Sequence, residues 1–344
     1  MKNLCVMIKP VSGKCNANCK YCFYRDEVES RAVADYGFFS KDLLNVFIDK
    51  ALDYVDGGHL TIVFQGGEPT LIGLDFYKYF FETLKNKNDK NATFTLSMQT
   101  NGILIDEEWC ALFKANDVLI GLSLDGDRQA NSERVDRSGK DFFPKILDTA
   151  RMFKEYGVEF NVLSVIHAKN VKRATIIYDE FIRRGFKNLQ FIPYLGDNPD
   201  YVLNADDYAN FLIDTYSRYA QDFNSNTPTR IRQFDNYIMI LQTGRAEQCG
   251  MNGVCEEQLV IEADGKAYPC DFYCIDQYEI GNVKDYSIEQ LLNSKIAKDF
   301  RSTSGNLKEC AGCKYFRICR GGCKRYASTT FCSAYKRFFD KAFR

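Results

Sequence analysis

The feature that most constrains the fold is a repeated alternation of strand-like and helix-like segments in the first part of the chain. Short apolar runs such as Leu4–Lys9 and Leu60–Gln65 alternate with amphipathic stretches, such as the one that Ser40 caps. Further strands are expected at residues 92–99, 118–124, 160–166 and 188–194, which makes six strand–helix pairs. Because strands separated by helices pair in parallel, we predict an α/β fold, either a partial barrel or a doubly wound sheet.

Polar residues follow four of these predicted strands directly. They are Cys15–Cys22, Gly66–Glu68, Gln99 with Asn101, and Ser123 with Asp125. In parallel α/β folds, binding sites are built at the carboxyl ends of the strands. We therefore expect these residues to share one active-site face.

The pattern changes after about residue 196. A helix is expected at about Ala205–Tyr219, and nine of the fourteen cysteines lie between Cys249 and Cys332. A short Cys- and Gly-rich segment has little apolar core and usually needs bound metal to fold. We therefore expect two domains, residues 1–230 and residues 231–344.

The cysteine count limits the kinds of metal site. No apolar run is long enough for a membrane span, and the N-terminal MKNLCVMIKP is too short in apolar residues for a signal peptide, so a cytoplasmic location is expected. Cytoplasmic cysteines rarely form structural disulfides. The only histidines are His59 and His167, which nearly excludes mixed Cys/His zinc sites. Zinc held by four thiolates and iron–sulfur clusters remain.

The charge balance argues against nucleic acid as a partner. The formal net charge is -1, whereas nucleic-acid-binding domains are usually basic. The basic run Lys314–Arg325 has a simpler explanation, because cations near a thiolate-held cluster offset its negative charge.

The stretch CNANCKYCFY, from Cys15 to Tyr24, contains three cysteines spaced C-x3-C-x2-C. A cluster held by three thiolates leaves one iron open to bind and polarise a small molecule. The alternative is a structural zinc site with a distant fourth ligand.

The triplet, with Tyr21 before its last cysteine, resembles the signature of the radical S-adenosylmethionine superfamily. GGEP, from Gly66 to Pro69, resembles the superfamily's GGE motif, which contacts the S-adenosylmethionine amino group. The cysteines from Cys249 onward resemble the SPASM domain. Together these resemblances imply a partial (β/α)6 TIM-like barrel followed by a Cys-rich SPASM domain, with S-adenosylmethionine and three [4Fe–4S] clusters as cofactors.

The resemblance also implies the ligands of each cluster. The first cluster takes Cys15, Cys19 and Cys22. One auxiliary cluster takes Cys249, Cys255, Cys270 and Cys323, and the other takes Cys310, Cys313, Cys319 and Cys332. Nine cysteines compete for eight places here, and Cys274 could replace Cys270.

Over nearly the whole chain the sequence resembles anaerobic sulfatase-maturating enzymes. The matching stretches are IKPVSGKCNANCKYCFY, FQGGEPTLIGL, QTNG, GLSLDG, CGMNGVC, YPCDFY and CRGGC. The resemblance implies Asp271 as general base, and a reaction pocket lined by Tyr24, Gln65 and Gln99. The S-adenosylmethionine contacts that it implies are Tyr21, Gly66, Gly67, Glu68, Ser123, Arg134 and Leu195.

Such an enzyme would oxidise a Cys or Ser of a target sulfatase to 3-oxoalanine (formylglycine) by abstracting a Cβ hydrogen. The expected partners are a peptide segment of an unfolded sulfatase and a reduced flavodoxin- or ferredoxin-like electron donor, with no nucleic acid and no membrane. Three other functions stay open. They are a SPASM peptide maturase that crosslinks or epimerises a small ribosomal peptide, a non-catalytic iron–sulfur electron carrier, and a zinc scaffold.

Overall fold

The computed structural model describes residues 1–223, 225, 228–302, 308–325 and 329–343. It divides into two compact units. The first unit comprises residues 1–122, 134–160 and 257–300, and the second comprises residues 123–133, 161–256 and 301–344. Each unit combines segments that are distant in the sequence.

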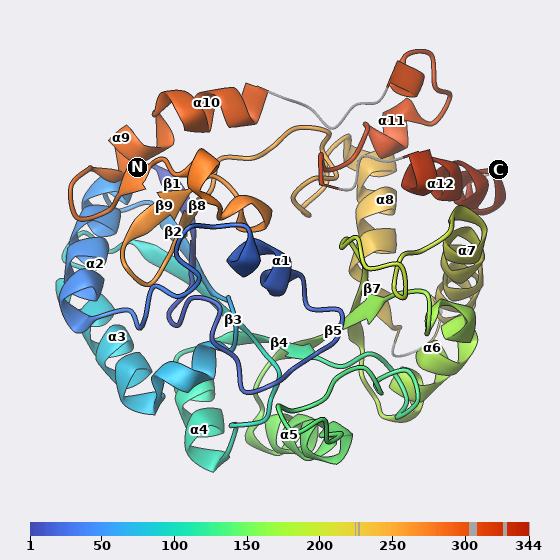
Figure 1. The fold of residues 1–344 in the computed structure, drawn as a ribbon, viewed down its shortest axis with the longest axis horizontal. Helices are drawn as coiled ribbons and strands as arrows, with labels where there is room; N and C mark the ends of the chain where they lie inside the picture. Colours follow the sequence, from blue (N-terminus) through green and yellow to red (C-terminus); the bar gives the residue numbers. More distant parts are fainter. Residues whose placement is uncertain (224, 226–227, 303–307, 326–328, 344) are drawn as a thin grey trace. The chain divides into compact units, whose positions relative to one another are not determined.

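The first unit contains a parallel sheet with a short antiparallel edge (Figure 1). Its strands follow the order β10-β9-β8-β1-β2-β3-β4. The parallel strands are β1 (Asn3–Ile8), β2 (His59–Phe64), β3 (Thr93–Thr100), β4 (Leu119–Ser123) and β8 (Leu259–Ile261). The antiparallel ones are β9 (Lys266–Tyr268) and β10 (Gly281–Asn282).

Amphipathic helices cover this sheet. They are α2 (Lys41–Val55), α3 (Leu74–Lys87), α4 (Glu107–Ala115) and α5 (Phe143–Tyr156). Helix α2 shows why they form: the Ser40 side chain accepts the Leu43 N–H, and a buried stripe from Leu43 to Val55 faces the strands. The shorter helices of the unit are α1 (Phe23–Glu29), α9 (Ile288–Leu292) and α10 (Lys295–Ser302), with 3-10 turns η1 (Pro69–Ile72), η3 (Asp271–Tyr273) and η4 (Asp276–Tyr278).

The strand register aligns the residues that follow β1 and β2. Ile8 pairs with Phe64, and Phe64 pairs with Met98. Lys9, Gln65 and Gln99 therefore come next at one level of the sheet, at its carboxyl edge.

The second unit has strands β5 (Phe160–Ile166), β6 (Asn188–Pro193) and β7 (Arg230–Ile231), which pair in parallel in that order. Its helices are α6 (Ala174–Arg183), α7 (Ala205–Asp222), α8 (Arg232–Thr243), α11 (Phe316–Cys319) and α12 (Thr329–Ala342), with 3-10 turns η2 (Val171–Arg173) and η5 (Lys308–Cys310). Helices α7, α8 and α12 share an aromatic core in which Tyr216, Phe234 and Phe338 pack with ring centroids 5.2–5.5 Å apart.

The predicted alternation of strands and helices is confirmed, with bounds that differ by a few residues. The expected helix at Ala205–Tyr219, for example, is α7 and ends at Asp222. The expectation that the chain from Cys249 onward lacks a core is wrong for residues 257–300. There β8 pairs with β1, and Leu259, Val260 and Ile261 are fully buried.

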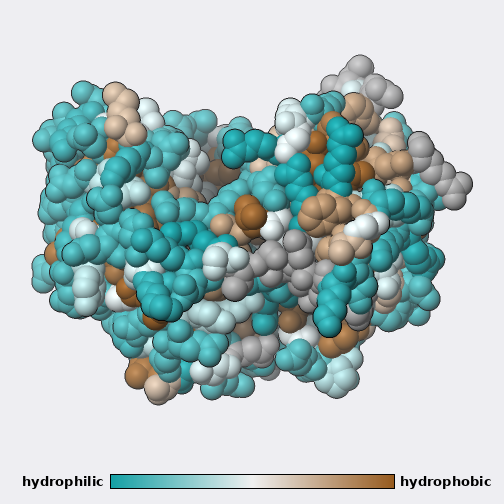
Figure 2. Space-filling model, turned by 90° about the horizontal axis from the view of Figure 1, so that it is seen from above, coloured by the Kyte–Doolittle hydropathy of each residue, from teal (hydrophilic) through white to brown (hydrophobic). Residues whose placement is uncertain are grey.

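No helix in the described part of the chain is long and apolar enough to cross a bilayer. The face shown in Figure 2 is mainly hydrophilic, with apolar residues in small groups.

Candidate functional site

The cysteine triplet lies in the loop between β1 and α1. Cys15, Cys19 and Cys22 are all half-buried. The Cys22 N–H donates to the Cys19 carbonyl at 3.2 Å, and the Ala17 N–H donates to Cys15 Sγ at 3.3 Å. A backbone turn therefore links Cys19 to Cys22, and a separate contact orients the Cys15 thiol.

The electrostatics of this loop fit a cationic group. Burial raises the pKa of Cys15 to about 12, and the negative charges of Glu68, Cys19 and Cys22 add to the shift. Burial also raises the pKa of Cys22. Metal ligation needs thiolates, so these thiols suit a site in which bound iron supplies the missing positive charge.

Across the described residues, no three Cys, His, Asp or Glu side chains form a group that could hold one metal ion. A [4Fe–4S] cluster instead binds one thiolate at each of several irons, so its ligands need to be near one another without converging.

Gly66 and Gly67 bring the end of β2 against the cysteine loop. The Gly67 N–H donates to the Ser12 carbonyl at 2.9 Å, and the Glu68 N–H donates to the Lys14 carbonyl at 2.8 Å. A Cβ at Gly67 would collide with the Lys14 carbonyl, and Gly66 has a φ of +126°. Glycine at these positions is therefore required by close backbone packing.

Glu68 is a buried carboxylate with neutral donors on every side. It accepts the Thr70 N–H and hydroxyl at 3.1 and 2.6 Å, the Thr100 hydroxyl at 2.7 Å and the Asn101 N–H at 2.7 Å. Burial raises the pKa of Glu68, and these hydrogen bonds oppose the shift. Glu68 thus ties the end of β2 to the end of β3, and its contact with S-adenosylmethionine stays a prediction.

Asp271 is another buried carboxylate of the first unit. It begins η3 and is 7% exposed. The Tyr24 hydroxyl donates to Oδ1 at 2.8 Å, and the Gln65 amide donates to Oδ2 at 3.1 Å. The structure therefore brings together three of the predicted pocket residues, which are far apart in the sequence.

Lys9 and Glu27 complete this cluster, and neither was predicted from the sequence. Lys9 Nζ lies 3.2 Å from Asp271 Oδ1 and 2.9 Å from Glu27 Oε2. Burial acts to lower the pKa of Lys9, but Cys274 and Tyr24, and after them Asp271 and Glu27, raise it well above its usual value. Lys9 is therefore a buried ammonium. Lys9 lies in the matching stretch IKPVSGKCNANCKYCFY, but the resemblance implied no role for it, and a lysine directly after an apolar strand looks like a strand end.

The other predicted cofactor contacts divide between the units. In the first unit, the Arg134 guanidinium lies over the Tyr21 ring, 5.4 Å from its centroid, and both side chains are buried. Gln99 is half-buried on β3 and pairs with Gly121 of β4. In the second unit, Ser123 is buried, and half-buried Leu195 follows β6. The roles of these residues stay predictions.

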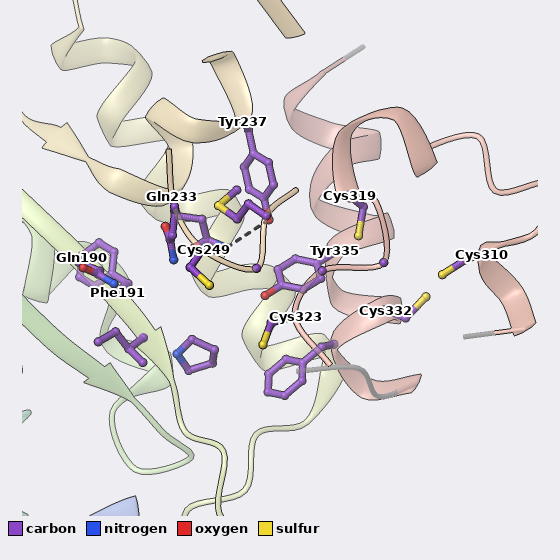
Figure 3. A pocket seen from close by; sticks show the side chains of 18 residues that line it. Gln190, Phe191, Gln233, Tyr237, Cys249, Cys310, Cys319, Cys323, Cys332 and Tyr335 are labelled. Atoms are coloured by element: carbon purple, nitrogen blue, oxygen red, sulfur yellow. Dashed lines mark hydrogen bonds between the residues drawn. The ribbon is translucent and has the colours of Figure 1, made fainter. Parts of the chain in front are cut away.

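Two groups of cysteines stand out in the second unit, and several of them line a pocket with an empty volume of about 850 Å³ (Figure 3). Desolvation raises the pKa of Cys249 to about 12, with contributions from Glu256, Cys323 and Cys255. Desolvation likewise raises the pKa of Cys319 to about 11, with contributions from Cys332, Cys310 and Cys313. The thiols that influence each other are the ones assigned to the same auxiliary cluster.

Cys270 and Cys274 lie in the first unit and differ in environment. Cys270 is half-buried before η3, whereas Cys274 is fully buried against Val260 and Tyr268. The Cys274 thiol donates to the Cys270 carbonyl at 3.5 Å, and burial raises its pKa well above the usual value. Which of these two cysteines holds a cluster stays a prediction.

Comparison with known proteins agrees with this geometry. Residues 10–176 match the radical SAM superfamily, and residues 249–314 match the SPASM iron–sulfur cluster-binding domain. The chain is 37% identical to a cysteine-type anaerobic sulfatase-maturating enzyme of Clostridium perfringens, over 100% of this chain and 97% of the relative. It is 28% identical to a serine-type enzyme of Klebsiella aerogenes, over 97% and 84% of the two chains.

The solved structure of native anSMEcpe with bound AdoMet and Cp18Cys peptide matches with a TM-score of 0.92 and 37% identity, over 99% of this chain and 97% of that one. Streptococcus suis SuiB matches at 17% identity and a TM-score of 0.63, which shows a shared fold alone. The predicted fold class and the predicted cofactor types, S-adenosylmethionine and iron–sulfur clusters, are confirmed at the level of the family. The chain belongs to the anaerobic sulfatase-maturating enzymes, radical SAM enzymes with a SPASM domain.

Proposed function

We propose that this protein oxidises a cysteine of a target sulfatase to 3-oxoalanine (formylglycine). The observation that carries the proposal is the placement of Asp271, which Tyr24, Gln65 and Lys9 hold in a buried site. Cysteine rather than serine is supported by similarity, because the cysteine-type relatives are 37% identical and the serine-type relatives are 26–28% identical.

The protein's own part in this reaction is to place a base beside the substrate and keep water away from it. When bound, S-adenosylmethionine and the clusters would supply a radical that removes a Cβ hydrogen atom, and would take up the remaining electron. Asp271 would accept the Sγ proton, so that the side chain loses two hydrogens and two electrons in all. Water would then replace sulfur and release hydrogen sulfide.

We also propose that the substrate is a peptide segment of the unfolded sulfatase. A structure with a bound Cp18Cys peptide, 37% identical in sequence, supports this. Tyr24, Gln65 and Gln99 are the residues that we expect to line the pocket for this peptide.

The electron donor that we propose is a reduced flavodoxin- or ferredoxin-like protein. The C-terminal segments 308–325 and 329–343 carry nine Lys and Arg residues against two acidic residues, in a chain of net charge -1. A [4Fe–4S] cluster with four thiolates is an anion that needs only part of this positive charge, so the excess suits an acidic partner. Electron transfer from such a donor should slow as the salt concentration rises, and unchanged rates would count against it.

The test is an anaerobic turnover assay with the reconstituted full chain, S-adenosylmethionine and a reductant. Two peptides, Cys-x-Pro-x-Arg and Ser-x-Pro-x-Arg, differ only in the target residue. We expect formylglycine from the cysteine peptide, in proportion to 5′-deoxyadenosine, and much slower conversion of the serine peptide. Deoxyadenosine without any change in peptide mass would reject the proposed substrate and revive peptide crosslinking.

A further inference from the structure

Lys9 occupies an unusual position for a lysine. Its side chain is 0% exposed, and its ammonium lies between Glu27 and Asp271 and over the ring of Tyr24, 4.5 Å from the centroid. A buried ammonium is costly unless it is paired and hydrogen-bonded. The fold therefore provides two carboxylates for one cation.

The backbone fixes Lys9 in this place. Its N–H donates to the Ile261 carbonyl at 2.9 Å, which continues the pairing of β1 with β8. A Cβ at Gly66 would lie 3.3 Å from Lys9 Cβ, so the absence of a side chain at Gly66 leaves room for the lysine stem. The ammonium is thus held by the sheet rather than by a mobile loop.

Glu27 links Lys9 to the segment that carries Asp271. Its Oε2 accepts from Lys9, and its Oε1 accepts the Cys274 N–H at 3.2 Å. Cys274 is the C-cap of the 3-10 turn η3, which Asp271 begins. Glu27 lies three residues after Tyr24 on α1, so the two side chains share one face of this helix. Tyr24 contacts Asp271 at the start of η3, and Glu27 contacts Cys274 just after η3.

We propose that Lys9 and Glu27 are positioning residues that hold the Asp271 carboxylate in its productive orientation. The inference rests on the proposed function, in which Asp271 removes the substrate proton. Lys9 acts directly on Oδ1, and Glu27 acts through Lys9 and through the backbone of the turn. Neither residue needs to touch the substrate.

The first part of the test is turnover of the cysteine peptide by the reconstituted full chain carrying Lys9→Met or Lys9→Arg. Misplacing a catalytic group can cost about 100-fold in rate, so we expect a loss of that order in formylglycine for Lys9→Met. Deoxyadenosine should fall much less, so its ratio to formylglycine rises above one, while the peptide KM changes little. Lys9→Arg keeps the charge and should restore much of the coupling.

The matched control is Lys50→Met. Lys50 is also held by the first unit, where its ammonium donates to the Val283, Lys284 and Tyr286 carbonyls at 2.6–3.0 Å. Its loss should lower stability and leave the product ratio at one. The proposal would be overturned if Lys9→Met made formylglycine at the wild-type rate with a deoxyadenosine-to-formylglycine ratio of one. It would also be overturned if this ratio rose equally in Lys9→Met and Lys50→Met.

A second variant covers the case in which Lys9→Met fails to fold. Lys9→Met with Glu27→Gln removes both members of the ion pair and leaves no unpaired charge at Glu27, so it should fold better than Lys9→Met alone. It should show the same raised ratio of deoxyadenosine to formylglycine, because Asp271 has lost the Lys9 ammonium in this variant too. A ratio of one in this double variant would contradict the proposal.

Crystal structures separate this inference from the proposed function. If the wild-type protein makes deoxyadenosine but no formylglycine, the proposed function fails. The positioning role is then tested by the place of the Asp271 carboxylate in the crystal structures. This carboxylate should move in the Lys9→Met protein and stay in place in the Lys50→Met protein. An unmoved carboxylate in Lys9→Met would reject the positioning role.

Discussion

Two of the buried carboxylates of the first unit, Glu68 and Asp271, are held in different ways. Glu68 is 1% exposed and receives only short hydrogen bonds from neutral groups next to β2 and β3. Asp271 is 7% exposed and receives a phenol, an amide and an ammonium on long side chains from three separate segments. The first arrangement joins two strands, whereas the second assembles polar groups around an oxygen that can exchange a proton. We therefore expect changes at Glu68 to affect stability and changes at Asp271 to affect chemistry.

The largest effect is expected from Asp271→Asn. The amide keeps the shape of the side chain but cannot accept the substrate proton, and general-base catalysis contributes about 10²- to 10⁴-fold in rate. Formylglycine formation, measured by peptide mass, should fall by that order. The absorbance of the reconstituted clusters should remain, and near-normal turnover would remove Asp271 from the mechanism.

Glu68→Gln should act on stability. The amide group would turn a donor toward the Thr70, Thr100 and Asn101 donors and leave buried groups unsatisfied, at a cost of about 1–3 kcal/mol for each such group. The free energy of unfolding, from denaturant titration, should fall accordingly. The protein that remains folded should still make one 5′-deoxyadenosine for each formylglycine. An excess of deoxyadenosine would show that Glu68 takes part in the chemistry.

Tyr24→Phe should have an intermediate effect on turnover. It removes the 2.8 Å hydrogen bond to Asp271 Oδ1 but leaves Gln65 and Lys9 in place. Loss of one hydrogen bond to a charged group costs about 1.5–3 kcal/mol, which corresponds to roughly a 10- to 100-fold lower rate. Steady-state kinetics would show this in kcat. If Tyr24→Phe lowered only the free energy of unfolding, Tyr24 would have a structural role like that of Glu68 and no part in turnover.

Thr100→Val should have the smallest effect. Thr100 gives Glu68 one of its four hydrogen bonds, and a hydrogen bond to a charged group contributes about 1.5–3 kcal/mol. Unfolding free energy should drop by that amount with normal turnover. A loss as large as that of Glu68→Gln would show that the donors around Glu68 act as a unit.

The sequence predicts much of the Asp271 site because its members occupy recognisable motifs. Tyr24 follows the cysteine triplet, Gln65 precedes GGEP, and Asp271 follows Cys270. Strand alternation further places Gln65 and Gln99 at one edge, and the observed register agrees with this.

Lys9, Glu27 and the small strands could not be predicted in the same way. Helix α1 spans only seven residues, FYRDEVE, which is too short for a periodic pattern to reveal its buried face. Strands β8 to β10 are two or three residues long within a Cys-rich segment. Their place in the first unit depends on long-range pairing with β1, which no local pattern encodes.

The measurement that tests the central claim most directly uses a peptide whose target cysteine carries deuterium at Cβ. Wild-type protein, S-adenosylmethionine and reductant are combined without oxygen, and both products are analysed by mass. If this protein abstracts a Cβ hydrogen and makes formylglycine, each formylglycine should be matched by one 5′-deoxyadenosine that carries one deuterium. Deuterium-free deoxyadenosine beside an unchanged peptide would contradict both the proposed substrate and the proposed chemistry.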